Sequence, residues 1–137
     1  MGCTIHPLGT LKNYKYVVIL SLYQGKILLS RHKDRDTWET QGGHIEPGET
    51  PLQAARRELF EESGAVRYEI RPLFDYFFGG SCGAAFEAEI FELGPIPESE
   101  MAEVKLFDQL PENITYPAIS PVLFREQERC SGFTSKV

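Results

Sequence analysis

The pattern of hydrophobic positions predicts a β-hairpin near the start of the chain. Residues 16–22 read YVVILSL, an almost unbroken apolar run that is typical of a strand covered on both faces. Gln24 and Gly25 follow as a turn, and residues 26–31 return as a second strand. We therefore expect two strands joined by a tight turn.

The period changes to that of an amphipathic helix after these strands. Thr50 is placed as an N-cap, Pro51 follows it, and Gln53 completes a capping box. Gly64 suits the left-handed residue just past a helix end. The sequence therefore predicts a helix over residues 51–63. Its apolar face consists of Leu52, Ala55 and Leu59.

Further strands are predicted in the second half of the chain. We expect one segment over residues 66–70 and another over residues 73–78, interrupted at Pro72. A flexible turn is expected over residues 79–83. Residues 86–90 alternate apolar and acidic positions, as in a half-exposed strand.

The remaining pattern predicts a loop, a strand and a helix. The loop covers residues 93–98, where glycine and prolines gather, and the strand covers residues 104–107. The helix has two possible starts, Pro117, or Pro121 with Ser120 as its cap. We place a single domain at residues 1–130 and a flexible tail at residues 131–137.

Composition excludes several classes of protein. The chain has 137 residues and a net charge of −6, so nothing supplies the broad basic face that coats DNA or RNA. No apolar run is long enough to span a membrane, and the first residues do not resemble a signal peptide. The scattered cysteines indicate free thiols in a reducing cytoplasm. They are Cys3, Cys82 and Cys130.

The charges at the far end of the predicted helix are unfavourable for its stability. Glu58, Glu61 and Glu62 lie in the last two turns, where they converge on one side at the negative end of the helix dipole. A divalent cation would relieve this repulsion, because clustered carboxylates suit hard ions such as Mg2+ or Mn2+. The alternative is a solvated acidic helix end with Arg56 and Arg57 as local partners.

The stretch around this helix resembles the signature of the Nudix hydrolase family. That signature has a glycine, a glutamate after five residues, and after seven more an Arg-Glu-aliphatic-any-Glu-Glu-any-Gly-aliphatic run. The last position is Ala65, which is smaller than the usual aliphatic residue, and Val66 follows it. The matching positions are Gly43, Glu49, Arg57, Glu58, Leu59, Glu61, Glu62 and Gly64.

The resemblance implies an α/β architecture, the Nudix fold, in which a mixed β-sheet lies between α-helices and the signature forms a loop–helix–loop. It also implies Mg2+ or Mn2+ as cofactor. Arg57 is expected to hold a glutamate in place, and Glu49 to brace the loop. The implied metal ligands are Glu58, Glu61, Glu62 and the carbonyl oxygen of Gly42. The implied catalytic residues are Arg57, Glu58, Glu61 and Glu100.

The proton acceptor has three candidates in this chain. Glu58 is one of them. Many relatives place a further glutamate just before the late strand, where it binds metal or acts as a base, and residues 100–107 resemble that region. We favour Glu100 over Glu103 for this role.

Substrate contacts are expected from four places, each with a structural alternative. In the charged loop over residues 31–36, Arg31, Lys33 or Arg35 would meet phosphates, or the loop is a solvated connector. Trp38 would stack on a base or belong to the core. Other aromatic and polar residues would line a base pocket or read a base edge. These are Phe78, and Asn113 or Tyr116.

The activity implied is hydrolysis of a nucleoside diphosphate linked to another group. The favoured substrate is a nucleoside triphosphate, in ordinary or oxidised form, which is cleaved to a monophosphate and pyrophosphate. We expect a monomer or homodimer with no membrane partner. Dinucleoside polyphosphates, nucleotide sugars and RNA 5′ ends are open alternatives. Rival classes are a non-catalytic nucleotide sensor and an isoprenoid diphosphate isomerase. The isomerase would need a catalytic cysteine, and Cys82 is expected at a loop tip.

Overall fold

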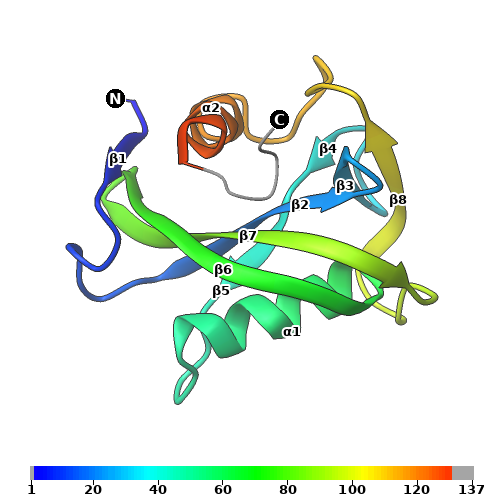
Figure 1. The fold of residues 1–137 in the computed structure, drawn as a ribbon, viewed down its shortest axis with the longest axis horizontal. Helices are drawn as coiled ribbons and strands as arrows, with labels where there is room; N and C mark the ends of the chain where they lie inside the picture. Colours follow the sequence, from blue (N-terminus) through cyan, green and yellow to red (C-terminus); the bar gives the residue numbers. More distant parts are fainter. Residues whose placement is uncertain (1, 131–137) are drawn as a thin grey trace.

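The computed structural model describes residues 2–130, which form one mixed β-sheet between two helices (Figure 1). The helices are α1 (Pro51–Ser63) and α2 (Ser120–Cys130). The strands are β1 (Thr4–His6), β2 (Tyr16–Tyr23), β3 (Lys26–His32), β4 (Trp38–Glu39), β5 (Gln41–His44), β6 (Ala65–Phe78), β7 (Ser81–Leu93) and β8 (Met101–Phe107). The predicted combination of a mixed sheet and covering helices is confirmed. Neither helix of the described range has the length and hydrophobicity of a membrane span.

Strand β2 is at the centre of the sheet. The strand order is β1-β6-β7-β2-β3-β4, and β8 pairs with β3. On one side β2 runs parallel to β7, and on the other its first half pairs with β5 and its end with β3. The predicted hairpin of β2 and β3 is therefore confirmed, and β2 has neighbours along both edges.

Each face of the sheet packs against one helix. On β2, Val17 and Ile19 belong to the cluster under α1, whereas Leu20 belongs to the cluster under α2. Because successive strand residues point to opposite faces, an unbroken apolar run serves both clusters. Figure 1 shows α1 and α2 on opposite sides of the sheet.

Local hydrogen bonds set the two ends of α1 as predicted. The side chain of Thr50 accepts a hydrogen bond from the Gln53 backbone, and the Gln53 side chain accepts one from the Thr50 backbone. Gly64 ends the helix in the left-handed conformation with φ of 79°. An added Cβ at Gly64 would lie 2.6 Å from the carbonyl oxygen of Gly94, so the position also needs a residue without a side chain.

The strand interruption predicted at Pro72 is wrong. β6 continues from Ala65 to Phe78, and a register shift between Pro72 and Phe74 accommodates the proline. The predicted turn is also shorter, because only Gly79 and Gly80, both with positive φ, connect β6 to β7. Cys82 is therefore a buried strand residue rather than a loop tip.

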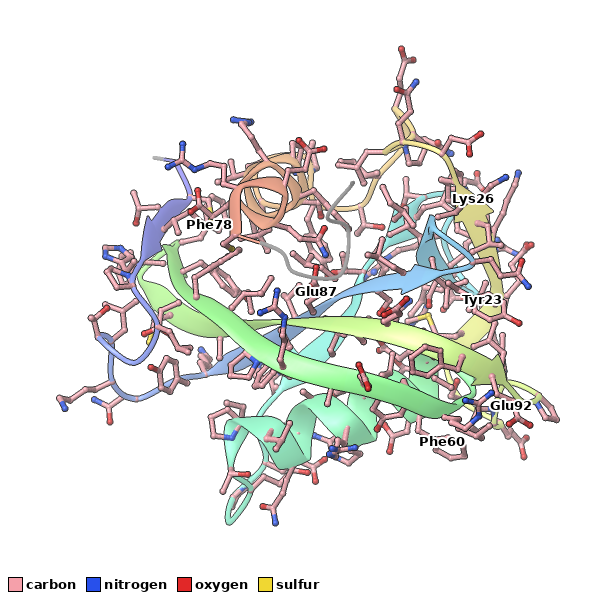
Figure 2. The ribbon with its side chains drawn as sticks, in the orientation of Figure 1. Tyr23, Lys26, Phe60, Phe78, Glu87 and Glu92 are labelled. Carbon is pink, nitrogen blue, oxygen red and sulfur yellow. The ribbon has the colours of Figure 1, made fainter. Side chains whose placement is uncertain are left out.

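The prediction that residues 86–90 form a half-exposed strand is also wrong. Glu87 is 0% exposed and lies on the α2 side of the sheet (Figure 2). Its carboxylate accepts hydrogen bonds from Arg71 Nε at 3.1 Å and from Gln127 Nε2, on α2, at 2.9 Å. The helix begins at Ser120, in line with the second of its two expected starts. The tail expected at residues 131–137 lies outside the described residues.

We predict that Gln127→Leu destabilises the protein by about 1–3 kcal/mol, because a buried carboxylate loses a donor while the side-chain volume is kept. Urea unfolding measures the change. The neighbouring exposed residue gives the control, and Glu128→Leu should change the stability by less than about 0.5 kcal/mol. Equal effects of the two substitutions would show that the bond to Glu87 does not hold α2.

Candidate active site

The site is built where α1 lies against β5. The backbone N–H of Gly42 donates a hydrogen bond to Glu62 Oε1 at 2.9 Å. At Gly43, an added Cβ would collide with the carboxylate of Glu58. The absence of a side chain at Gly43 therefore lets the Glu58 carboxylate lie directly against β5, while the backbone of Gly42 holds that of Glu62.

Arg57 connects the loop before α1 to the glutamates of the helix. Its Nε and Nη2 bind the two carboxylate oxygens of Glu49 at 2.6 and 2.9 Å. Nη2 also donates to the carbonyl oxygen of His44 at 3.1 Å, and Nη1 lies 3.2 Å from Glu58 and 3.4 Å from Glu61. The hydrogen bond from Arg57 lowers the pKa of Glu49 to about 2. Glu49 is thus engaged in bracing the loop.

Burial makes the other carboxylates costly to ionise. It raises the pKa of Glu62 to about 9, against the effect of the Gly42 N–H, and the nearby Glu58 adds to the rise. Burial also raises the pKa of Glu58, although Arg57 opposes it. Buried carboxylates of this kind are stabilised in their charged form by a cation.

The chemistry of these oxygen donors suits a hard divalent cation, but their positions in the structure do not surround a single point. Glu58, Glu61 and Glu62 offer carboxylate oxygens, and Gly42 lines the same cavity. Within residues 2–130, no three His, Cys, Asp or Glu side chains are arranged to hold a metal ion. The Nη1 of Arg57 contacts one carboxylate oxygen of Glu58 and one of Glu61.

Two adjoining cavities meet at β5. We call one the acidic cavity; it has a volume of about 660 Å³, and its carboxylates come from Glu39, Glu46, Glu58, Glu61, Glu62, Glu98 and Glu100. We call the other the aromatic cavity; it has a volume of about 460 Å³, and its rings come from Tyr16, His44, Tyr76, Phe78 and Tyr116. Both are lined by Glu39, Gly42, Gly43, His44 and Tyr116. One elongated ligand can therefore occupy both.

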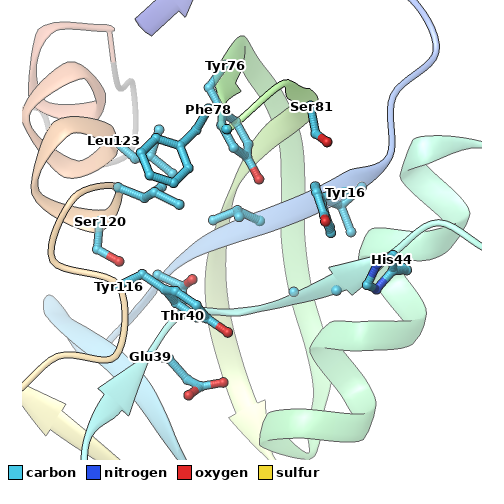
Figure 3. Close-up of a pocket in the computed structure, with 16 residues that line it drawn as sticks. Tyr16, Glu39, Thr40, His44, Tyr76, Phe78, Ser81, Tyr116, Ser120 and Leu123 are labelled. Carbon is cyan, nitrogen blue, oxygen red and sulfur yellow. The ribbon is translucent and has the colours of Figure 1, made fainter. Parts of the chain in front are cut away.

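Figure 3 shows the aromatic cavity. Phe78 and Tyr76 lie on one side of it, and Tyr116 and Thr40 lie across from them. Ser120 at the start of α2 adds a hydroxyl group to the wall. A flat heteroaromatic group would find stacking surfaces and a few polar partners in this space.

The structure separates the two glutamates considered for the late strand. Glu100 lines the acidic cavity, whereas Glu103 forms an ion pair with Arg31 at 2.8 Å and lines neither cavity. The cause is a β-bulge, since Arg31 pairs with Glu103 but His32 pairs with Met101. The extra residue changes the facing of the strand, which is what bulges do next to active sites.

Of the three cations expected to meet phosphates from the charged loop, one lines the acidic cavity. Lys33 lines neither cavity, and Arg31 is held by Glu103 and by the carbonyl of Arg35. Arg35, the third of the expected cations, lines the acidic cavity, and so does His32. The sequence of a charged loop does not show which of its cationic side chains faces a cavity. It therefore could not distinguish Arg35 from Arg31 and Lys33.

The predicted base-binding residues are also divided. Phe78 lines the aromatic cavity. Trp38 is only 9% exposed and packs edge-on against Phe107 with ring centroids 5.2 Å apart, which agrees with the core alternative. Asn113 lines neither cavity and binds the carbonyl of Asp36 at 3.0 Å, whereas its alternative Tyr116 lines both.

Glu39 is a site residue that the sequence did not reveal. It is 8% exposed and lines both cavities. Its Oε1 accepts hydrogen bonds from Arg35 at 2.9 Å and from the hydroxyl of Thr115 at 2.8 Å. Its position between Trp38 and the glycines of β5 was the one available signal.

Comparison with known proteins places this fold and site in a family. Residues 13–109 match the NUDIX domain family, which is more than half of the chain. The chain therefore belongs to the Nudix family. RNA pyrophosphohydrolases of Yersinia enterocolitica and Yersinia pestis are 41% identical over 56 residues. Those alignments cover 41% of this chain and only 32% of the length of each relative.

Solved structures confirm the Nudix fold. A pyrophosphohydrolase from Bacillus subtilis superposes with a TM-score of 0.79 and 25% identity, covering 97% of this chain and 93% of that one. A MutT structure from Aliivibrio salmonicida or Vibrio cholerae gives a TM-score of 0.64 at 22% identity, covering 86% of this chain and 99% of that one. The chain is thus similar in part of its sequence to RNA pyrophosphohydrolases and in its fold to a pyrophosphohydrolase of known structure.

We predict that Glu62→Gln stabilises the metal-free protein at neutral and higher pH. The pKa of Glu62 is about 9 when folded and 4.5 in its ordinary range, so between these values only the folded state keeps the proton. Stability therefore falls as pH rises through this window in the wild type but not in the variant. Urea unfolding with a chelator should show the variant more stable at pH 8 and the difference vanishing near pH 4.5. A difference in stability that does not change with pH would contradict burial as the cause of the raised pKa of Glu62.

Proposed function

We propose that this chain hydrolyses a pyrophosphate bond in a nucleoside 5′-polyphosphate and uses Mg2+ or Mn2+. The observation that carries the proposal is the junction of the two cavities at Gly42 and Gly43. The aromatic cavity suits the base, and the acidic cavity suits a metal-bound polyphosphate. Without a cation the carboxylates would repel the phosphates, so the same geometry supports metal dependence.

The proposed metal ligands are Glu58, Glu62 and the carbonyl of Gly42, with help from Glu61. The bound cation would neutralise phosphate oxygens and lower the pKa of a bound water. Arg57 keeps its contacts to Glu49 and so holds the loop in register with the helix end. Arg35 offers the remaining positive charge of the acidic cavity to the phosphates, and Glu39 fixes its guanidinium group.

The chemical step is the attack of water on phosphorus. The water oxygen forms a new P–O bond, the bridging P–O bond breaks, and the displaced phosphate keeps the bonding electrons. The proton from the water passes to a carboxylate at the rim of the acidic cavity. We assign this role to Glu100, with Glu58 as the alternative, because Glu100 is not engaged by Arg57.

The favoured substrate is a nucleoside triphosphate, including oxidised forms, which would give a monophosphate and pyrophosphate. The aromatic cavity of about 460 Å³ is large enough for one nucleoside. A second candidate is the 5′-triphosphate end of RNA. It is supported by the similarity to RNA pyrophosphohydrolases of Yersinia and to the pyrophosphohydrolase from Bacillus subtilis.

A product-release assay tests the proposal. The purified chain is given Mg2+ or Mn2+ with ordinary and oxidised nucleoside triphosphates, nucleotide sugars, dinucleoside polyphosphates and 5′-triphosphorylated RNA. We expect pyrophosphate or phosphate release from a triphosphate substrate, abolition by chelator, and a loss of about 100-fold or more in Glu62→Gln. Binding of these compounds without release of any product would instead support a nucleotide sensor.

A further inference from the structure

The contacts of His32 define a role that the reaction outlined above leaves unassigned. His32 is the last residue of β3, lines the acidic cavity and is largely buried, with its side chain 18% exposed. Glu100 lies opposite, directly before β8, and its side chain is 85% exposed. An exposed glutamate samples many rotamers unless a partner holds it.

The ring of His32 is fixed in one tautomer by the loop that follows it. The backbone N–H of Asp34 donates a hydrogen bond to Nδ1 at 3.1 Å. Since a backbone N–H can only donate, Nδ1 is the acceptor, and the proton of the neutral ring is on Nε2. The backbone N–H of Arg35 donates to the carbonyl oxygen of His32 at 3.1 Å, which closes the same turn.

The protonated nitrogen is directed at the glutamate. Nε2 of His32 lies 3.3 Å from Oε1 of Glu100. The backbones are joined at the same place, because the N–H of Lys33 donates to the carbonyl of Glu100 at 2.8 Å. The neighbouring Arg31 holds Glu103 on the other side of the bulge. Two adjacent residues of β3 thus bind the two glutamates separately, and only the one bound by His32 reaches the cavity.

We propose that His32 is a positioning residue that holds Glu100 at the rim of the acidic cavity by donating its Nε2–H to the carboxylate. The proposal rests on the proposed hydrolase function and on the role of Glu100 in it. His32 does not touch the reacting atoms. It limits the orientations of the carboxylate, and the turn over residues 32–35 limits those of the ring.

Two substitutions of His32 test the roles of its two ring nitrogens separately. Glutamine places an amide donor near the position of Nε2, whereas asparagine reaches only as far as Nδ1. We expect His32→Gln to keep kcat within about twofold, and His32→Asn to lower it roughly three- to tenfold with little change in KM, the size expected for one partly exposed hydrogen bond. Kinetics use the compound of the release assay that the wild type hydrolyses fastest, and thermal unfolding checks the fold.

A double-mutant cycle with Glu100→Ala tests whether His32 acts through Glu100. In the Glu100→Ala background, His32→Asn should cause no further loss of kcat. An equal loss in both backgrounds would overturn the proposal, as would a normal kcat of His32→Asn beside an impaired Glu100→Ala. Nitrogen-15 spectra of the wild-type imidazole should show the proton on Nε2, and a proton on Nδ1 would also overturn it.

The outcomes distinguish this proposal from the one on which it rests. If no compound of the release assay is hydrolysed, or Glu62→Gln is fully active, the proposed function fails and the positioning role fails with it. If Glu62→Gln is inactive while Glu100→Ala is fully active, the hydrolase stands and only the roles of Glu100 and His32 are overturned.

Discussion

The structure depends on the close approach of α1 to β5. Gly43 brings no side chain to this contact, so the carboxylate of Glu58 lies against the strand, and the N–H of Gly42 holds the carboxylate of Glu62 there. Burial raises the pKa of both glutamates. Charged groups are costly to bury, and Arg57 offsets part of this cost for Glu58, whereas the N–H of Gly42 offsets part of it for Glu62. The protein thereby keeps carboxyl groups whose charged forms a cation would stabilise.

The features that the sequence predicts correctly are those set by interactions between near neighbours in the chain. The ends of α1 follow from Thr50, Gln53 and Gly64, whose hydrogen bonds and backbone conformation involve only near neighbours. The clustering of the glutamates follows from helical spacing alone, and the family signature adds their association with Gly43. These parts of the fold and site could be predicted before any coordinates were known.

The features that the sequence does not predict are those set by contacts between segments that are far apart in the chain. Glu87 alternates with apolar residues like a solvent-facing position, and only the packing of α2 reveals that its face is covered. Glu100 rather than Glu103 lies at the cavity because of a β-bulge in the pairing of β3 with β8. Residue propensities do not predict where such a bulge forms. Glu39 is likewise a site residue only because two cavities meet beside it.

Binding of Mn2+ to the free protein, followed by electron paramagnetic resonance, tests the central claim that the α1–β5 contact creates a cation site. Gly43→Ala forces the Glu58 carboxylate to move, whereas an added Cβ at Gly94 makes only ordinary contacts of 3.5 Å. We predict that Gly43→Ala weakens Mn2+ binding at least about tenfold while Gly94→Ala binds like the wild type. Equal affinity in all three proteins, or no binding by the wild type, would contradict the account.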